Sequence, residues 1–147
     1  MKPLVFAILS AIVALPAGAE VTRVAAQGSV PEVMDRLEAA VGGAGATVFA
    51  RVDHGAGAAS VEMELGASEL LIFGNPALGT PAMQADPLAG LYLPLKVLAY
   101  EDGEGGVWLA YEEPADMFEG LGVPADAEVL VKMSGALGKL TAVAAGG

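Results

Sequence analysis

The sequence holds one histidine, and a carboxylate stands directly before it in the pair Asp53-His54. An imidazole titrates near neutral pH, so a neighbouring carboxylate can orient the ring or raise its pKa for acid–base chemistry. Asn75 and Thr80 stand just beyond a second apolar stretch and could add an amide and a hydroxyl group. These four residues are therefore the candidate ligand-binding or acid–base residues of the chain.

Two strands are expected to position these side chains. Residues 47–53 place alternate apolar side chains on one face, and residues 69–73 form an apolar run typical of a strand covered on both faces. The chain between them is long enough for a helical crossover, which favours parallel strands. Parallel strands end at one edge of a sheet, where open α/β sheets bind ligands. Asp53, His54 and Asn75 are therefore expected to meet there.

Thr80 is expected to cap a helix that has Pro81 as its first residue. The free N–H groups of that helix end would then face the same polar cluster and could bind an anion. A structural interpretation of the cluster stays open beside this one. In it, Asp53 and Asn75 hold turns in place, and His54 satisfies a backbone carbonyl.

His54 also supports an alternative in which the protein is an enzyme or binds a metal or haem. Together with a methionine, His54 could hold copper or ligate a b-type haem. The candidate methionines are Met63, Met83, Met117 and Met133. Methionines at helical or strand spacing more often fill gaps in a core, and no paired-histidine spacing is present. Copper and haem are therefore weak alternatives, and whether the protein is an enzyme stays open.

Composition narrows the class of protein further. The chain has 147 residues, 7 Lys+Arg against 18 Asp+Glu, a formal net charge of -11, and no cysteine. That length fits one domain, and an apolar fraction of 54% is too high for a disordered chain. Without cysteine there is no thiol nucleophile, and no serine stands in a Gly-x-Ser-x-Gly motif. Nucleic acid is excluded as a partner because phosphate binding needs clustered Lys and Arg.

The first 19 residues have the layout of a secretory signal peptide. Lys2 precedes an apolar run over residues 4–15, Pro16 breaks that run, and Ala17-Gly18-Ala19 is a small-residue cleavage motif. The apolar run is shorter than the roughly 20 residues that span a bilayer. We therefore expect a periplasmic or secreted protein, residues 20–147, with no membrane association after cleavage.

The rest of the chain is expected to form further strands and two long helices. Ser29 to Glu32 is a capping box before a helix that ends near Ala44. Strands are expected over residues 21–26, 95–100 and 107–111, the last two joined by a hairpin loop. A helix over about residues 125–144 carries an apolar stripe of Leu130, Met133, Leu137, Leu140 and Ala144. These elements predict one α+β domain.

Several segments stand out as an ordered set: Thr47–His54, Glu69–Pro76, Gly79–Pro81, Leu93–Val97 and Val107–Tyr111. Together they resemble the "domain of unknown function 302" family over about residues 30–122. The resemblance implies a two-layer fold with a mixed β-sheet of four to five strands, helices mainly on one face, and often a dimer. It implies no reaction. Glu112 stands where the family usually has an asparagine, so any role of that asparagine would be absent here.

These patterns favour an exported, non-enzymatic module that forms a homodimer and binds a small molecule or a partner protein. The expected binding residues are Asp53, His54, Asn75 and Thr80.

Overall fold

The computed structural model describes residues 20–146, so the expected signal peptide, residues 1–19, lies outside the described part. The strands are β1 (Val21–Ala26), β2 (Thr47–Asp53), β3 (Ser68–Gly74), β4 (Leu95–Glu101) and β5 (Val107–Glu112). The helices are α1 (Val30–Gly43), α2 (His54–Ala59), α3 (Pro76–Ala85), the 3-10 helix η1 (Pro87–Leu91), α4 (Pro114–Met117) and α5 (Glu128–Ala145).

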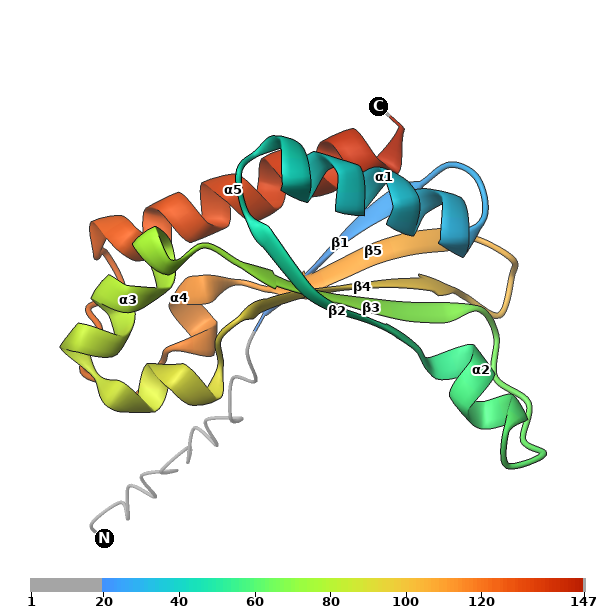
Figure 1. Ribbon diagram of the computed structural model, residues 1–147, viewed down its shortest axis with the longest axis horizontal. Helices are drawn as coiled ribbons and strands as arrows, with labels where there is room; N and C mark the ends of the chain where they lie inside the picture. The colour runs from blue at the N-terminus through green and yellow to red at the C-terminus, as the bar shows by residue number, and fades with distance from the viewer. Residues whose placement is uncertain (1–19, 147) are drawn as a thin grey trace, which may run out of the picture.

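The five strands form one open sheet in the order β1-β5-β4-β3-β2. The helices α1 and α5 lie together on one face of the sheet, which confirms the two-layer α+β fold (Figure 1). All the strand pairings in the described residues are antiparallel, whereas the resemblance implied a mixed sheet.

The expected parallel arrangement of β2 and β3 is wrong. The two strands are antiparallel neighbours, with Thr47 opposite Gly74 and Asp53 opposite Glu69. The segment between them contains only the six-residue helix α2. That helix is about 9 Å long, whereas a seven-residue strand spans about 23 Å, so it cannot carry the chain back along the strand. The chain instead reverses at the end where β2 finishes.

The core lies between the sheet and the helices α1 and α5. Val33, Leu37 and Val41 form the buried stripe of α1. The stripe expected for the last helix is also buried: Leu130, Met133, Leu137, Leu140 and Ala144. Both stripes have helical spacing, so each helix presents one continuous apolar face to the sheet. The capping box at the start of α1 is confirmed, with the Ser29 N–H donating to the Glu32 carboxylate at 2.8 Å.

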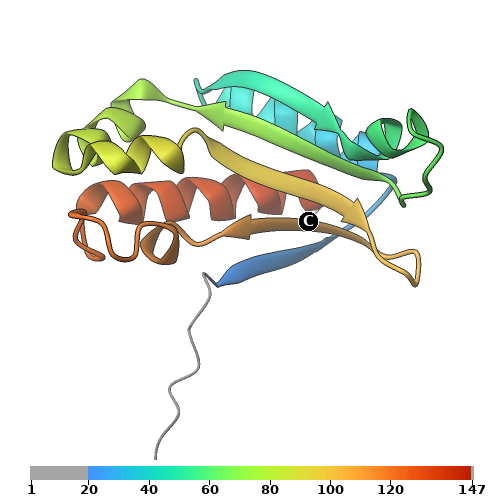
Figure 2. The ribbon, with the colours of Figure 1, turned by 90° about the horizontal axis from the view of Figure 1, so that it is seen from below.

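The opposite face of the sheet also carries apolar side chains. Figure 2 looks onto this face, which we call the uncovered face because, within residues 20–146, the two long helices α1 and α5 both lie on the other side. Along β3 and β4, fully buried residues alternate with half-buried ones. The half-buried residues pair across strands, Leu70 with Leu98 and Tyr100 with Trp108. The apolar run at residues 69–73 predicted that this strand is covered on both faces. That prediction is wrong, because α1 and α5 both lie on one side of the sheet.

Within residues 20–146, we find no helix that is both long enough and apolar enough to cross a lipid bilayer.

Candidate functional site

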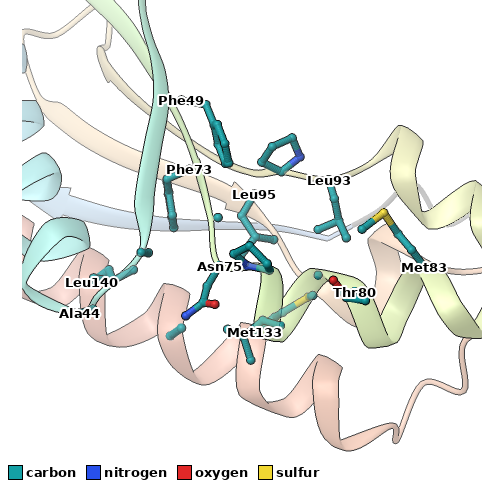
Figure 3. A pocket seen from close by; sticks show the side chains of 17 residues that line it. Ala44, Phe49, Phe73, Asn75, Thr80, Met83, Leu93, Leu95, Met133 and Leu140 are labelled. Carbon is teal, nitrogen blue, oxygen red and sulfur yellow. The ribbon is translucent and has the colours of Figure 1, made fainter.

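A cavity of about 360 Å³ lies at the end of the sheet where β2 begins and β3 finishes. Antiparallel pairing brings three strand ends together there, because Thr47 pairs with Gly74 and Phe73 pairs with Leu95. The helix α3 follows β3 directly, and α5 passes on the helix side of the sheet (Figure 3). We call this space the end cavity. Its lining residues are Ala44, Ala46, Phe49, Phe73, Gly74, Asn75, Pro76, Leu78, Gly79, Thr80, Met83, Leu93, Pro94, Leu95, Met133, Ala136 and Leu140.

The helix α3 forms one wall of the end cavity, and its start is fixed by the sequence Gly-Asn-Pro. The side-chain oxygen of Asn75 accepts the Ala77 N–H at 2.9 Å, as an N-cap residue does. Pro76 occupies the first helical position, where its missing N–H costs nothing. One turn later Gly79 has no side chain, and a Cβ added there would lie 3.5 Å from Leu93 and 3.9 Å from Met83 of the same helix.

The floor and rim of the end cavity are apolar. Phe73 and Met133 are almost fully buried at its base. At the rim, 58% of Phe49 and 38% of Met83 are exposed. Contact between apolar side chains of this size and water is unfavourable, because the free energy falls when apolar surface is removed from water. An apolar ligand that covered Phe49 and Met83 would recover that free energy.

Asn75 and Thr80 supply the polar side chains of the cavity wall. None of the 17 lining residues is charged. A cavity of this volume, with apolar walls and a few polar groups, matches the usual composition of small-molecule sites. The end cavity can therefore bind a ligand by apolar burial, and its wall holds no acid–base pair.

The structure brings Asn75 and Thr80 together at the end cavity but places Asp53 and His54 elsewhere. The end of β2 lies about 20 Å along the strand from its start, and α2 and α3 stand at opposite ends of the sheet (Figure 1). The expected single cluster of four residues is therefore wrong. The cause is the antiparallel pairing of β2 with β3, which sends their carboxyl ends in opposite directions.

Asp53 and His54 form the start of the short helix α2. The Asp53 carboxylate accepts the Ala56 N–H at 2.8 Å and so caps the helix, where the structural interpretation expected it to hold a turn in place. His54 is the first helical residue and is exposed. Among the described residues, no three His, Cys, Asp or Glu side chains gather as a metal site would require. Whether either residue binds a ligand remains a prediction.

Thr80 does not cap a helix, so that prediction is wrong. The helix α3 starts at Pro76, five residues before the predicted first residue Pro81, and both Thr80 and Pro81 lie inside it. Asn75 followed by proline is the stronger start signal, because it supplies the capping oxygen and the fixed backbone angle together.

The residues missed by the sequence interpretation are the apolar ones that build the cavity. Phe49, Leu93 and Met133 come from β2, the segment before β4, and α5, so no local motif joins them. The sequence held one signal for this wall of the cavity. Gly74-Asn75-Pro76 indicates the end of a strand and the start of a helix, and Gly79 allows that helix to approach a neighbouring segment closely.

Two comparisons place this fold among known proteins. The family model described as "Domain of unknown function DUF302" matches residues 22–140. The crystal structure of an uncharacterized conserved DUF302 protein from Bacillus stearothermophilus is similar, with a TM-score of 0.68 and 16% identity. The likeness covers 86% of this chain and 95% of that one, and at such identity it shows the fold alone.

Curated proteins that are named for an activity also match. The fluoride-specific ion channel FluC 1 proteins of Brucella suis biovar 1 (strain 1330) and Brucella abortus biovar 1 (strain 9-941) are each 43% identical over 120 residues. The match covers 80% of this chain but only 47% and 44% of those proteins. The chain therefore spans about half the length of the curated relatives that it matches.

Proposed function

This chain belongs to the DUF302 family, and we propose that it is a binding module that takes a small apolar molecule into the end cavity. The observation that carries the proposal is the cavity itself, about 360 Å³ in volume, with uncharged and mainly apolar walls. Pre-formed clefts of this size and chemistry are the usual sites of small-molecule binding. Binding would also cover the exposed ring of Phe49 and the exposed side chain of Met83 at the rim.

The positions of Asp53 and His54 support binding over catalysis as the main proposal. Both lie at the far end of the sheet from the end cavity, so neither can act on a molecule held there. An enzyme or metal-binding role for His54 would need a second site around α2. The shallow hollow beside α2 is lined by Gly55, Ala59, Met63, Glu64, Leu65 and Gly66, without Asp53 or His54.

A fluorescent apolar probe tests the proposal directly. N-phenyl-1-naphthylamine should bind the purified chain with one-to-one stoichiometry and gain fluorescence. The variant Gly79→Leu should weaken binding by at least about tenfold, because the added side chain grows toward Leu93 and Met83 and fills the cavity. Helical propensity favours leucine over glycine, so this variant should stay folded.

The matched control is Gly138→Leu. Gly138 is also a helical glycine, it has nothing within 4 Å of an added Cβ, and it does not line the cavity. This variant should bind the probe like the unmodified chain. Equal probe binding by Gly79→Leu and Gly138→Leu would contradict a site in the end cavity.

Export and dimerisation belong to the same proposal. The signal-peptide pattern of residues 1–19 supports a periplasmic or secreted location. The uncovered sheet face supports a homodimer, because its half-buried Tyr100 and Trp108 are residue types enriched in interfaces. Export is tested by fractionation and by the mass of the secreted chain, which should begin at Glu20. A full-length chain retained in the cytoplasm would contradict it.

The Brucella relatives favour a second candidate function, an accessory role beside a fluoride channel. The matched region is less than half of each relative, and no helix in residues 20–146 of this chain could cross a bilayer. An ion channel must cross the membrane, so the pore of those proteins belongs to the part outside the match. We infer that the region matched by this chain forms a domain joined to the channel in the Brucella proteins. In this protein the same domain would act on a fluoride channel as a separate chain.

Fluoride resistance tests the accessory role. Fluoride-sensitive cells would express the Brucella suis relative either whole or without the 120 matched residues. If the domain serves the channel, the truncated form should give less resistance, and this chain expressed with it should restore part of the loss. Equal resistance with and without the matched residues would argue against the accessory role.

A further inference from the structure

We infer that the end cavity selects uncharged ligands and rejects anionic ligands of the same shape. This inference rests on the proposed ligand-binding function, and it names the class of ligand that the site takes.

The first argument comes from the cavity wall. None of its 17 residues is a lysine or an arginine, so an anion brought inside would lose its hydration without gaining a counter-charge. Lys96 follows a lining residue in sequence but is not part of the wall. Its ammonium group donates to the backbone carbonyl of Tyr92 at 3.1 Å instead.

The second argument comes from the start of α3, which borders the cavity. A helix N-terminus binds anions when its first N–H groups are free. Here the Ala77 N–H donates to the Asn75 side chain, and the Leu78 and Gly79 N–H groups donate to the Asn75 carbonyl oxygen at 2.9 and 3.0 Å. Pro76 has no N–H to offer. The helix end is therefore closed to an anion by its own cap.

The third argument comes from the whole chain, whose formal net charge is -11. Its potential repels anions at a distance, and salt screens that repulsion. A cation would be attracted from a distance, but it would still enter a cavity whose wall carries no carboxylate. Both charged classes are therefore disfavoured inside, whereas an uncharged molecule meets only apolar walls and the amide and hydroxyl of Asn75 and Thr80.

Two probes with the same ring skeleton provide the test. N-phenyl-1-naphthylamine is uncharged, and 8-anilino-1-naphthalenesulfonate is the same molecule carrying a sulfonate group. The uncharged probe should bind at least about tenfold more tightly, because desolvation of the sulfonate is uncompensated. The difference should persist at 1 M salt, where long-range repulsion is screened. Equal affinities at 1 M salt would overturn the inference.

A variant that adds a cation to the wall makes the test sharper. Met83→Lys places an ammonium group at the exposed rim, and it should raise the affinity for the sulfonate probe several-fold. Val131→Lys is the matched control, since Val131 is 63% exposed on α5 and does not line the cavity. Both changes alter the net charge equally. The same gain in both variants would show that only overall charge matters, which would contradict selection by the wall.

The outcomes separate this inference from the proposed function. If neither probe binds, or if Gly79→Leu leaves both affinities unchanged, the proposed cavity function fails. If both probes bind equally and Gly79→Leu weakens both, the cavity binds ligands but does not select by charge.

Discussion

Asp53 and Asn75 hold equivalent local positions, each between the end of a strand and the start of a helix. Each side-chain oxygen accepts a backbone N–H of the first helical turn, from Ala56 at 2.8 Å and from Ala77 at 2.9 Å. Capping alone accounts for the residue type at both positions. Only Asn75 also borders a cavity, so only there does the side chain have a second possible role.

At the level of single residues, His54→Ala should leave probe binding unchanged. His54 is exposed and lies outside the end cavity, so the dissociation constant of N-phenyl-1-naphthylamine should change by less than about twofold. The stability in urea should change by less than about 0.5 kcal/mol. A large loss of probe affinity in His54→Ala would place the site at the α2 end.

Asp102 gives a pH-dependent prediction at the hairpin between β4 and β5. The indole N–H of Trp108 donates to its carboxylate at 2.8 Å, and the Gly106 and Glu104 N–H groups also donate. These hydrogen bonds, that from Trp108 most of all, lower the pKa of Asp102 below its ordinary value of 3.8. A lowered pKa means that the stabilisation is complete above pH 3.8 and is lost as the pH falls through the lowered pKa.

The fluorescence of Trp108 measures this loss, because it is the only tryptophan in the chain. The emission should stay constant from neutral pH down to about pH 4 and change below it. Asp102→Asn keeps an oxygen that can accept the indole N–H but cannot ionise. The acid transition of the emission should therefore disappear in Asp102→Asn, and an identical transition in that variant would contradict the assignment.

At the level of elements, Arg51 joins β2 to β3 and to α1. Its guanidinium group donates to the carboxylate of Glu69 and to the Asp35 carboxylate at 2.6 Å. The hydrogen bond to Glu69 is the main reason why the pKa of Arg51 is raised, so the group stays charged. Glu69 is only 7% exposed, so Arg51 is the partner of a carboxylate that has little contact with water.

Arg51→Met should therefore destabilise the chain by about 2 kcal/mol, because the Glu69 carboxylate is left partly buried and unpaired. Urea unfolding measures the loss. Lys132→Met is the control, since it removes the exposed pair between Lys132 and Glu128 on α5 and should cost less than about 0.5 kcal/mol. Equal losses in the two variants would mean that the Arg51 contacts add no stability of their own.

At the level of the whole molecule, the end cavity links distant parts of the chain. Its lining extends from Ala44 to Leu140 and includes residues of the sheet, α3 and α5. A ligand that binds only the folded chain at 100 times its dissociation constant should stabilise it by about 2.7 kcal/mol. Thermal unfolding with N-phenyl-1-naphthylamine at that concentration should shift upward by several degrees. In Gly79→Leu the shift should fall to about half or less, because a tenfold weaker affinity lowers the stabilisation to about 1.4 kcal/mol.

The uncovered sheet face gives a second prediction at this scale. If two copies pair through this face, Leu98→Glu should bring one carboxylate from each copy into the apolar interface. The buried charges should then separate the dimer into monomers. Val131→Glu is the control, because Val131 is exposed on α5, on the helix side of the sheet. Light scattering should show dimers for the unmodified chain and the control. A monomeric unmodified chain at high concentration would contradict the proposed dimer.

The sequence predicted most elements because their signals are local. The strand expected at residues 47–53 is β2 with those bounds, and the apolar stripe from Leu130 to Ala144 is the buried face of α5. The α+β fold and the position of the helices on one face followed from such patterns and from the family resemblance. Of the candidate site, the sequence predicted that Asn75 and Thr80 lie near each other, and both line the end cavity. Asp53 and His54 do not line it, and ligand binding by any of the four residues stays a prediction.

By itself, the sequence determined where strands and helices form, because hydrophobic spacing, caps and prolines act over a few residues. It also determined the charge of the chain and indicated that Asp53 and Asn75 can hold turns in place, although not which helices they cap. The direction of β3 relative to β2 was decided only by tertiary structure. Strand pairing depends on contacts between distant segments, and here it separated His54 from Asn75 by the length of the sheet and gathered apolar residues from five elements around one cavity.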